Sequence, residues 1–223
     1  MSQELSRIFD LLLPATGETL IMVAFALFFS VIIGVPLGIL LVVTRPGNIL
    51  GQHQALSLLN RVLNILVNFI RSIPFIILIL WVIPVTKHVV GTTIGVKGAI
   101  FPLFLYAAPF IARVTETAIL EIKPGIIEAF IAPGASPWQI ITRVLLRESR
   151  SSLILALTTA AVSLIGGTAM AGTVGAGGLG HLAIRNGYQS YDLAVMNATI
   201  IVLFILVQLL QSAGNTLARK LRR

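Results

Sequence analysis

The stretch that decides the fold is residues 20–43, "LIMVAFALFFSVIIGVPLGILLVV", which has 24 residues and no charged side chain. A helix needs about 20 consecutive apolar residues to cross the hydrocarbon core of a bilayer. Residues 151–180 and 193–218 are also uncharged and long enough. The chain of 223 residues is 57% hydrophobic and 11% charged, whereas about a quarter of the residues of a soluble domain are charged. The sequence therefore predicts an all-α, polytopic membrane protein.

Two shorter apolar stretches, residues 72–86 and 98–112, become long enough to cross the membrane if each helix continues past a charge at one end. That charge is Arg71 in the first stretch and Arg113 in the second. We expect a single transmembrane domain over residues 1–223. The first span is too long to be a cleaved signal peptide. The five expected spans are at about residues 17–43, 60–86, 95–119, 151–174 and 193–217.

The positive charges are distributed unevenly between the segments that join these spans. If residues 44–71, 113–150 and 219–223 face the cytoplasm, that side holds 12 of the 16 basic residues. Positive residues favour the cytoplasmic side of a membrane. We therefore expect the N-terminus outside and the C-terminus in the cytoplasm. The net charge of +8 then reflects topology and contact with anionic lipid, and not binding to nucleic acid.

Side chains suited to catalysis or metal binding are scarce. The absence of cysteine excludes disulfides, thiol catalysis and cysteine metal sites. The three histidines lie apart in loops, without a carboxylate or a second histidine at ligand spacing. We therefore expect no catalytic residue, no metal site and no cofactor bound by this chain.

The segment Lys123–Arg150 is too polar to cross the membrane and too apolar to be a slack linker. Within it, "PGASP" (residues 133–137) is expected to stop one helix and force a turn. Ser136 is then expected to cap a second helix whose first residue is Pro137. The apolar stripe expected on this second helix is Trp138, Ile141, Val144 and Leu145. From the pattern alone, this hairpin either lies on lipid head groups or docks a cytosolic partner.

The stretch "EAFIAPGASPWQIITRVLL" (residues 128–146) resembles the E-A-A-x-x-x-G signature of inner-membrane permeases from ATP-binding-cassette importers. In that family the segment forms the coupling helix, which sits in a groove of the ATPase subunit. Two departures are Phe130 in place of the third signature residue and Arg147 in place of a proline. The resemblance implies that the ATPase-coupling residues are Glu128, Ala129, Phe130, Gly134, Ala135 and Ser136.

The resemblance extends over the whole chain and is strongest to the methionine-importer permeases. It rests on "TRPG" (44–47), "NFIRSIPFIILILWVIP" (68–84), "APFIARVTETAILEI" (108–122), "GAGGLG" (175–180), "NGYQSYD" (186–192) and "VMNATI" (195–200). It implies a homodimer in the bacterial inner membrane that forms one pathway. It also implies two cytosolic ATPase subunits that hold ATP and Mg, and an external substrate-binding lipoprotein.

Other functions remain open beside this one. A permease for another small amino acid or a compatible solute would share many of these stretches. A self-sufficient channel or secondary transporter is a remote alternative, because such proteins often show internal repeats and ionisable residues near the midplane. The chain shows no convincing repeat, and spans one, four and five carry no charge in their middle.

Residues 163–180, "SLIGGTAMAGTVGAGGLG", hold seven glycines and three alanines. The G-x-G-x-x-G spacing within this stretch is that of a dinucleotide loop, but such a loop follows a strand and has an acidic residue about 20 positions further on. Here it follows a membrane span instead. Small residues allow transmembrane helices to approach closely and shift, so we expect a gate, with Met170 either at its constriction or as a filler. The expected gate residues are Met170, Gly166, Gly167, Gly172, Gly175, Gly177 and Gly180.

A few polar side chains fall within or near the spans. Arg113 and Glu116 are three residues apart, so we expect them to pair on one face of a helix. Their place near a span end favours anchoring at the head groups over a functional role. Asn64, Asn68 and Asn197 are expected to form hydrogen bonds between helices.

Overall fold

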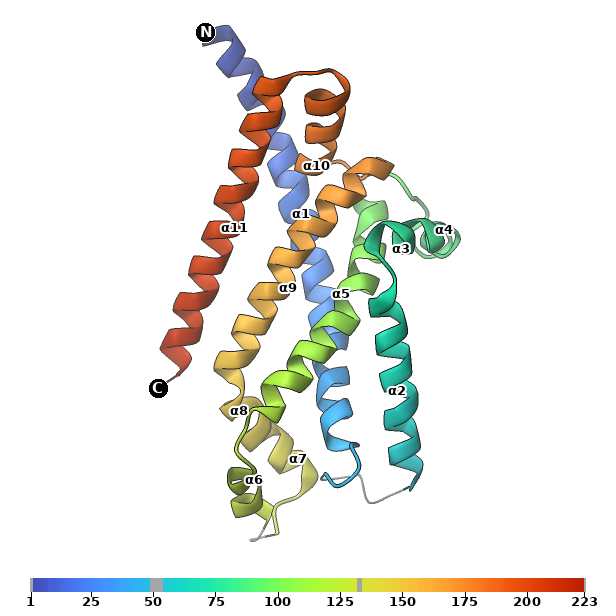
Figure 1. Ribbon diagram of the computed structural model, residues 1–223, viewed down its shortest axis with the longest axis vertical. Coiled ribbons are helices and arrows are strands. Elements are labelled where there is room, and N and C mark those ends of the chain that lie inside the picture. Colours follow the sequence, from blue (N-terminus) through green and yellow to red (C-terminus); the bar gives the residue numbers. More distant parts are fainter. Residues whose placement is uncertain (1, 49–53, 132–133, 223) are drawn as a thin grey trace. The chain divides into compact units, whose positions relative to one another are not determined.

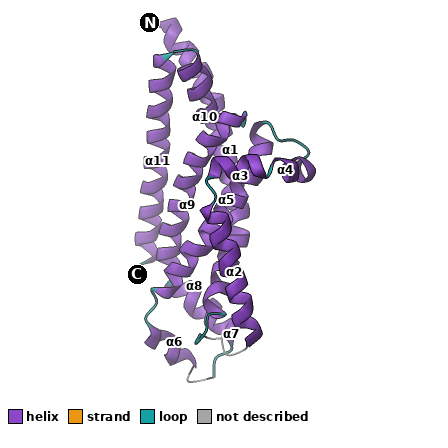
Figure 2. Ribbon diagram, turned by 45° about the vertical axis from the view of Figure 1, so that its right-hand side comes forward, coloured by secondary structure: helices purple, strands orange, loops and turns teal. Residues whose placement is uncertain are grey.

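The computed structural model describes residues 2–48, 54–131 and 134–222, and within these ranges every regular element is helical (Figures 1 and 2). The all-α prediction is confirmed. Two short segments, Ile140–Leu145 and Ala183–Gln189, are π-helical, and Gly172–Val174 is a 3-10 turn. The α-helices are α1 (Ser2–Val43), α2 (Gln54–Ser72), α3 (Phe75–Trp81), α4 (Ile83–Val90), α5 (Gly95–Leu120), α6 (Pro124–Ile131), α7 (Pro137–Gln139), α8 (Leu146–Glu148), α9 (Arg150–Ala171), α10 (Gly178–Leu182) and α11 (Leu193–Leu221).

Four of the described helices are long and apolar enough to cross a membrane unaided: α1, α5, α9 with its 3-10 extension, and α11. The second predicted span is wrong as one continuous helix over residues 60–86. It is divided into α2, α3 and α4, and α2 and α3 meet at an angle of 103°. Counting that bent pair as a span gives five.

The break between α2 and α3 lies at Pro74. Its backbone is extended, with φ −56° and ψ 137°, and proline has no N–H to donate to the preceding turn. The carbonyl of Pro74 instead accepts from Ile77 and Leu78 and so begins α3. A second proline, Pro84, lies in the first turn of α4, which ends at the left-handed Gly91.

Helix α1 begins about 15 residues earlier than predicted, at Ser2 rather than residue 17. The reason is tertiary packing of its first half. Ile8, Leu11 and Leu12 pack against a buried cluster that includes Leu179 and Val195. Burial of these apolar side chains stabilises the helix although the stretch is too polar to be recognised as a span.

The chain forms two compact units. The first comprises the described parts of residues 1–29, 73–107 and 161–212, and its core is built around Met22, Leu103 and Leu164. The second comprises the described parts of 30–72, 108–160 and 213–223. Its core is a smaller cluster of Val42, Val43, Ile119, Ile140, Val144 and Leu145.

The beginning of α11 is capped by Asp192 in the first unit. The N–H of Val195 donates to Asp192 Oδ1 at 3.1 Å, and the Arg7 guanidinium pairs with the same carboxylate. These two contacts hold the pKa of Asp192 below its ordinary value. Beyond the cap, the exposed face of α11 carries large apolar side chains such as Ile201, Phe204 and Ile205, as expected of a surface that contacts lipid.

Candidate functional site

Helix α6 begins the predicted coupling segment in the second unit. Ile126 and Ile127 pack against the core of that unit. Ala129 and Phe130 are exposed, Phe130 by 44% of its surface. The backbone of Glu128 lies on this helix, while its side chain is outside the described part of the chain. The helix is thus fixed by its isoleucines and presents residues 129 and 130 outward.

Gly134, the first residue described after α6, has a φ of +83°, a left-handed conformation that suits glycine. The next helix carries the expected cap. The N–H of Gln139 donates to Ser136 Oγ at 3.3 Å, and the N–H of Ser136 donates to Gln139 Oε1 at 2.9 Å. This reciprocal pair is a capping box, with Pro137 as the first helical residue. The N-cap predicted at Ser136 is confirmed.

The apolar stripe predicted for the second helix is wrong at Trp138, which is 72% exposed. The buried residues are Ile140, Val144 and Leu145. Residues 140–145 form a wide π-helical turn, so the buried positions are spaced by four and five residues. Trp138 lies two residues before Ile140, about half a helical turn away, and therefore points away from the core. We call five of the exposed residues around the turn the coupling surface: Ala129, Phe130, Gly134, Ser136 and Trp138.

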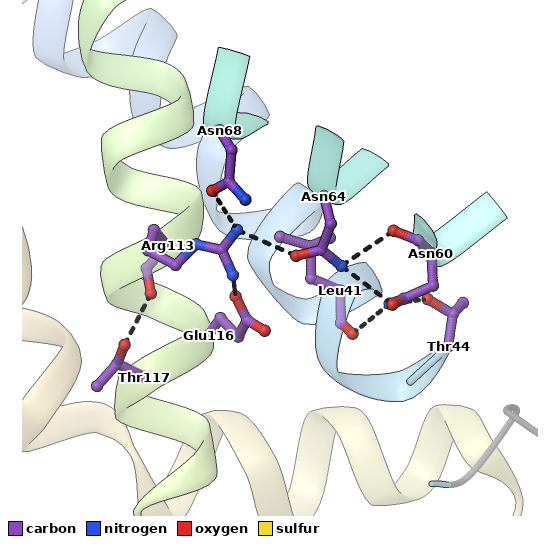
Figure 3. Close-up of polar contacts among 8 residues, drawn as sticks. All are labelled: Leu41, Thr44, Asn60, Asn64, Asn68, Arg113, Glu116 and Thr117. Carbon is purple, nitrogen blue, oxygen red and sulfur yellow. Dashed lines mark hydrogen bonds and ion pairs between the residues drawn. The ribbon is translucent and has the colours of Figure 1, made fainter. Parts of the chain in front are cut away.

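A polar network joins α2 and α5 in the second unit (Figure 3). Arg113 on α5 pairs with Glu116 at 2.5 Å, which confirms the predicted ion pair. The other guanidinium nitrogen donates to Asn64 Oδ1 at 3.0 Å and Asn68 Oδ1 at 2.9 Å, so these asparagines form hydrogen bonds between helices as predicted. Arg113 is therefore held by three acceptors from α2 and α5.

The same network continues to the end of α1 through Asn60 (Figure 3). Its Nδ2 donates to the carbonyl of Leu41 at 2.7 Å and to Thr44 Oγ1 at 2.9 Å. Asn64 Nδ2 donates to Asn60 Oδ1 at 3.0 Å. Asn60 was not predicted, although asparagines at 60, 64 and 68 repeat every four residues and so share one helical face.

The glycine-rich segment 172–182 lies in the first unit. Gly175, Gly177 and Gly178 have φ values of +81°, +85° and +77°, which side chains other than glycine rarely adopt. The carbonyl of Gly175 accepts from the N–H of Gly95 at 2.9 Å. These residues form a turn between α9 and α10 that is bonded to the start of α5.

Two other glycines of this segment permit backbone-to-backbone packing. A Cβ at Gly172 would lie within 3.0 Å of the backbone of Gly180 and His181, and a Cβ at Gly180 would lie equally close to the backbone of Ala169. His181 Nδ1 is 3.1 Å from the carbonyl of Gly172. The end of α9 and α10 are thus in contact at a spacing that only glycine allows.

The N-terminal end of α10 is capped by side chains from α1. The N–H of Gly178 donates to Glu18 Oε2 at 2.6 Å, and the N–H of Leu179 donates to Thr19 Oγ1 at 2.9 Å. We call this pair of contacts the Glu18 cap. Sequence reasoning missed Glu18, and the available signal was a lone carboxylate directly before the uncharged stretch 20–43.

The remaining predicted gate residues lie on different faces of α9. Gly166 and Met170 are exposed, Met170 by 51%, and nothing lies near a Cβ built at Gly166. Gly167 faces the core of the first unit, where a Cβ would meet Leu103 at 2.9 Å. The structure therefore brings together Gly172 and Gly180 in one contact and leaves Gly166 and Met170 on an open face.

Within residues 2–48, 54–131 and 134–222, no three His, Asp or Glu side chains are placed to hold a metal ion. What these residues provide is an exposed surface, a helix-joining polar network and a tightly packed turn.

Comparison with known proteins gives concordant matches. Residues 34–223 match the family described as "Binding-protein-dependent transport system inner membrane component". The "Probable D-methionine transport system permease protein MetI" of Vibrio cholerae is 46% identical over 211 residues, which are 95% of this chain and 92% of the relative. The D-methionine transport system permease protein MetI of Escherichia coli is 49% identical over 73% of each chain.

Solved structures are similar as well. One of the MetNI methionine ABC transporter in an inward-facing conformation matches with a TM-score of 0.93 and 47% identity, over 97% of this chain and 99% of that chain. An amino acid ABC transporter matches with a TM-score of 0.71 at 14% identity. The second match shows a shared fold alone.

Proposed function

The chain belongs to the binding-protein-dependent transport system inner membrane components, and from this premise we propose that it is the permease subunit of a methionine importer. The observation that carries the proposal is the agreement with the methionine transporter structure over 97% of this chain at 47% identity. Relatives named for D-methionine support transport of that stereoisomer as well as L-methionine. Two copies of the chain form the pathway, with two ATPase subunits and an external binding protein as partners.

The proposed orientation places the N-terminus outside and the C-terminus in the cytoplasm. Its support is the charge distribution, with 12 of the 16 basic residues in segments 44–71, 113–150 and 219–223. The coupling surface then lies on the cytoplasmic side, where an ATPase subunit is available. The glycine-rich segment lies on the outer side, away from ATP.

The coupling surface is proposed to contact the ATPase subunit. Support comes from its construction, since α6 is anchored by two partly buried isoleucines and α7 by its own capping box, yet Phe130 and Trp138 remain exposed. Aromatic side chains are enriched where interfaces bind most strongly. Residues 121–123 alone separate α5 from α6, so a shift of this surface is passed directly to a membrane-spanning helix.

ATP binding by the partner then drives the transport cycle through this connection. Nucleotide favours the state in which the ATPase subunits are closed, and a ligand shifts an equilibrium by its difference in affinity for the two states. The helices of the permease move largely as rigid bodies. No covalent chemistry is required of this chain.

The pathway is proposed to run along the open face of α9 that carries Gly166 and Met170. The exposed residues of this face in the first unit are small or polar, apart from Met170 itself: Gly166, Met170 and Thr173. The exposed face of α11 is instead large and apolar, with Ile201 and Phe204. That contrast supports a lipid-facing α11 and a pathway-facing α9, where Met170 supplies a flexible constriction.

The test is ATP-dependent uptake of labelled methionine into proteoliposomes that contain this chain, its ATPase subunit and its binding protein. We expect uptake only with all three components and ATP, and competition by unlabelled methionine. Uptake without the ATPase subunit would support a secondary transporter or channel and contradict the proposal. Competition by a compatible solute but not by methionine would contradict the assigned substrate.

A further inference from the structure

A cavity of about 310 Å³ lies in the second unit at the junction of two membrane-spanning helices. Its lining comes from the residues before and at the start of α9 and from the end of α11. The two helices are held together there by Ser151 Oγ, which donates to the carbonyl of Ala218 at 3.0 Å. The lining residues are Arg147, Glu148, Arg150, Ser151, Leu221 and Arg222.

This cavity is placed at the boundary of the membrane by chain topology. Helices α9 and α11 are successive spans. The start of the first and the end of the second therefore lie on the same side of the bilayer, whichever orientation the protein has. A cavity between those two ends is at the depth of lipid head groups.

The charge of the cavity favours an anion. Three arginines and one glutamate line it, which leaves an excess of positive charge. Arg147 and Arg222 are exposed, so their guanidinium groups are accessible. Guanidinium groups bind phosphate oxygens through paired hydrogen bonds. The start of α9, a helix of 22 residues, adds the positive end of its dipole and N–H groups without helical acceptors.

Apolar side chains continue from the cavity along both helices. Leu155 lies one turn beyond Ser151 on α9, and Leu217 lies one turn before Leu221 on α11. They are 41% and 51% exposed. Residues four apart share one face of a helix, so both leucines lie on the faces that contribute to the cavity. A ligand that fits has an anionic head and apolar chains.

We propose that this cavity binds the phosphate of an anionic phospholipid, with the acyl chains along Leu155 and Leu217. Free phosphate would use the arginines and leave the leucines uncovered, whereas a phospholipid uses both. The site is separate from the coupling surface and from the Glu18 cap. It lies beyond the proposed transport function, because lipid binding here requires neither ATPase nor substrate.

The test measures phosphatidylglycerol bound to the purified full-length chain in zwitterionic detergent, by native mass spectrometry across a lipid titration. The variant Arg147→Gln/Arg222→Gln removes two charges from the cavity lining. Its control, Arg219→Gln/Lys220→Gln, removes the same charge from neighbouring residues that do not line the cavity. We expect the cavity variant to weaken binding by about tenfold or more, since it loses the charge-assisted hydrogen bonds of two guanidinium groups to the phosphate, and the control to bind nearly as the unaltered chain does.

Two further arms identify the ligand. Phosphatidylcholine should bind more weakly than phosphatidylglycerol, and inorganic phosphate should not displace the lipid. Equal loss of binding in both variants would show a diffuse charge effect and overturn the proposal. Equal binding of the two lipids, or displacement by inorganic phosphate, would overturn the assignment to an anionic phospholipid. Circular dichroism melts of both variants establish that they are folded.

Discussion

The turns before α10 and before α7 have similar backbone and capping geometry, but the side chains that cap them come from different parts of the chain. In each, a left-handed glycine precedes a short helix whose first N–H groups are bonded to side-chain oxygens. At α10 the oxygens belong to Glu18 and Thr19, which are 160 residues away in sequence. At α7 the cap comes from Ser136 and Gln139, three residues apart.

The difference shows which turn can be altered without damage to the fold. The α10 turn is part of the packing of the first unit, because its glycines touch backbone and its cap belongs to α1. The α7 turn supports itself and leaves Phe130 and Trp138 exposed. We therefore expect substitutions at α10 to reduce stability, and substitutions on the coupling surface to reduce partner binding instead.

The largest effect is expected at Gly180. Gly180→Ala places a methyl group within 3.0 Å of the Ala169 backbone, which cannot move as a side chain can. We expect the free energy of unfolding to fall by about 3 kcal/mol, because extra atoms forced into a tightly packed contact destabilise the folded state. The measurement is thermal unfolding in detergent, followed by circular dichroism.

Gly166→Ala is the matched control for that substitution. Gly166 lies on α9, the helix that Gly180 contacts through Ala169, with nothing within 4 Å of a new Cβ. Alanine is the better helix former by roughly 0.5–1 kcal/mol, so stability should be unchanged or slightly higher. Equal melting temperatures for the two variants would show that the close backbone contact at Gly180 does not determine stability.

A smaller loss is expected for Glu18→Ala. The N–H of Gly178 would lose its acceptor in a partly buried place, and an unsatisfied buried donor costs about 1–3 kcal/mol. Glu18→Gln retains an acceptor oxygen and should lose less. Amide hydrogen exchange at Gly178 checks this directly. Unchanged protection in Glu18→Ala would show that the Glu18 cap does not hold the turn.

Ser136→Ala should have a smaller effect on the whole protein than Glu18→Ala. Removal of an N-cap side chain costs about 1 kcal/mol of helix stability, and here the helix is at the exposed end of the second unit. We expect faster amide exchange at Gln139 and little change in the melting temperature. A large fall in melting temperature would mean that this turn is also part of the packed core.

The smallest change in stability, and a clear change in function, is expected for Trp138→Ala. An exposed side chain outside the core alters stability by no more than about 0.5 kcal/mol. Loss of an aromatic side chain at an interface should weaken ATPase binding by roughly tenfold. Thermal unfolding in detergent gives the change in stability, and ultracentrifugation of the permease with its ATPase subunit gives the change in binding. Unaltered binding would exclude Trp138 from the interface.

A feature of this structure can be predicted from the sequence when the residues that form it are close together in the chain. The uncharged stretch 20–43 predicts a span because bilayer thickness sets its length, and Ser136 predicts a cap because its partner is three residues away. The resemblance of residues 128–146 to importer permeases is confirmed by the family match. Each of these signals is local.

Other features depend on contacts that the sequence does not reveal. Pro14 and Pro36 lie within the single helix α1, whereas Pro74 separates two helices at 103°. The residue type is the same, so the outcome depends on the packing around it. Glu18 was missed for the same reason, since its partners are distant in sequence. The gate assigned to Met170 and the coupling role of Glu128 remain predictions.

The central claim is that the coupling surface binds the ATPase subunit, and the chain is suited to a direct test because it contains no cysteine. Ala129→Cys introduces one thiol on that surface, and Ser190→Cys introduces one at an exposed position of the first unit. The measurement is the rate of maleimide labelling of each variant, with and without the purified ATPase subunit. We predict that the ATPase subunit protects Ala129→Cys and leaves the labelling of Ser190→Cys unchanged. Equal labelling of Ala129→Cys in both conditions would contradict the claim.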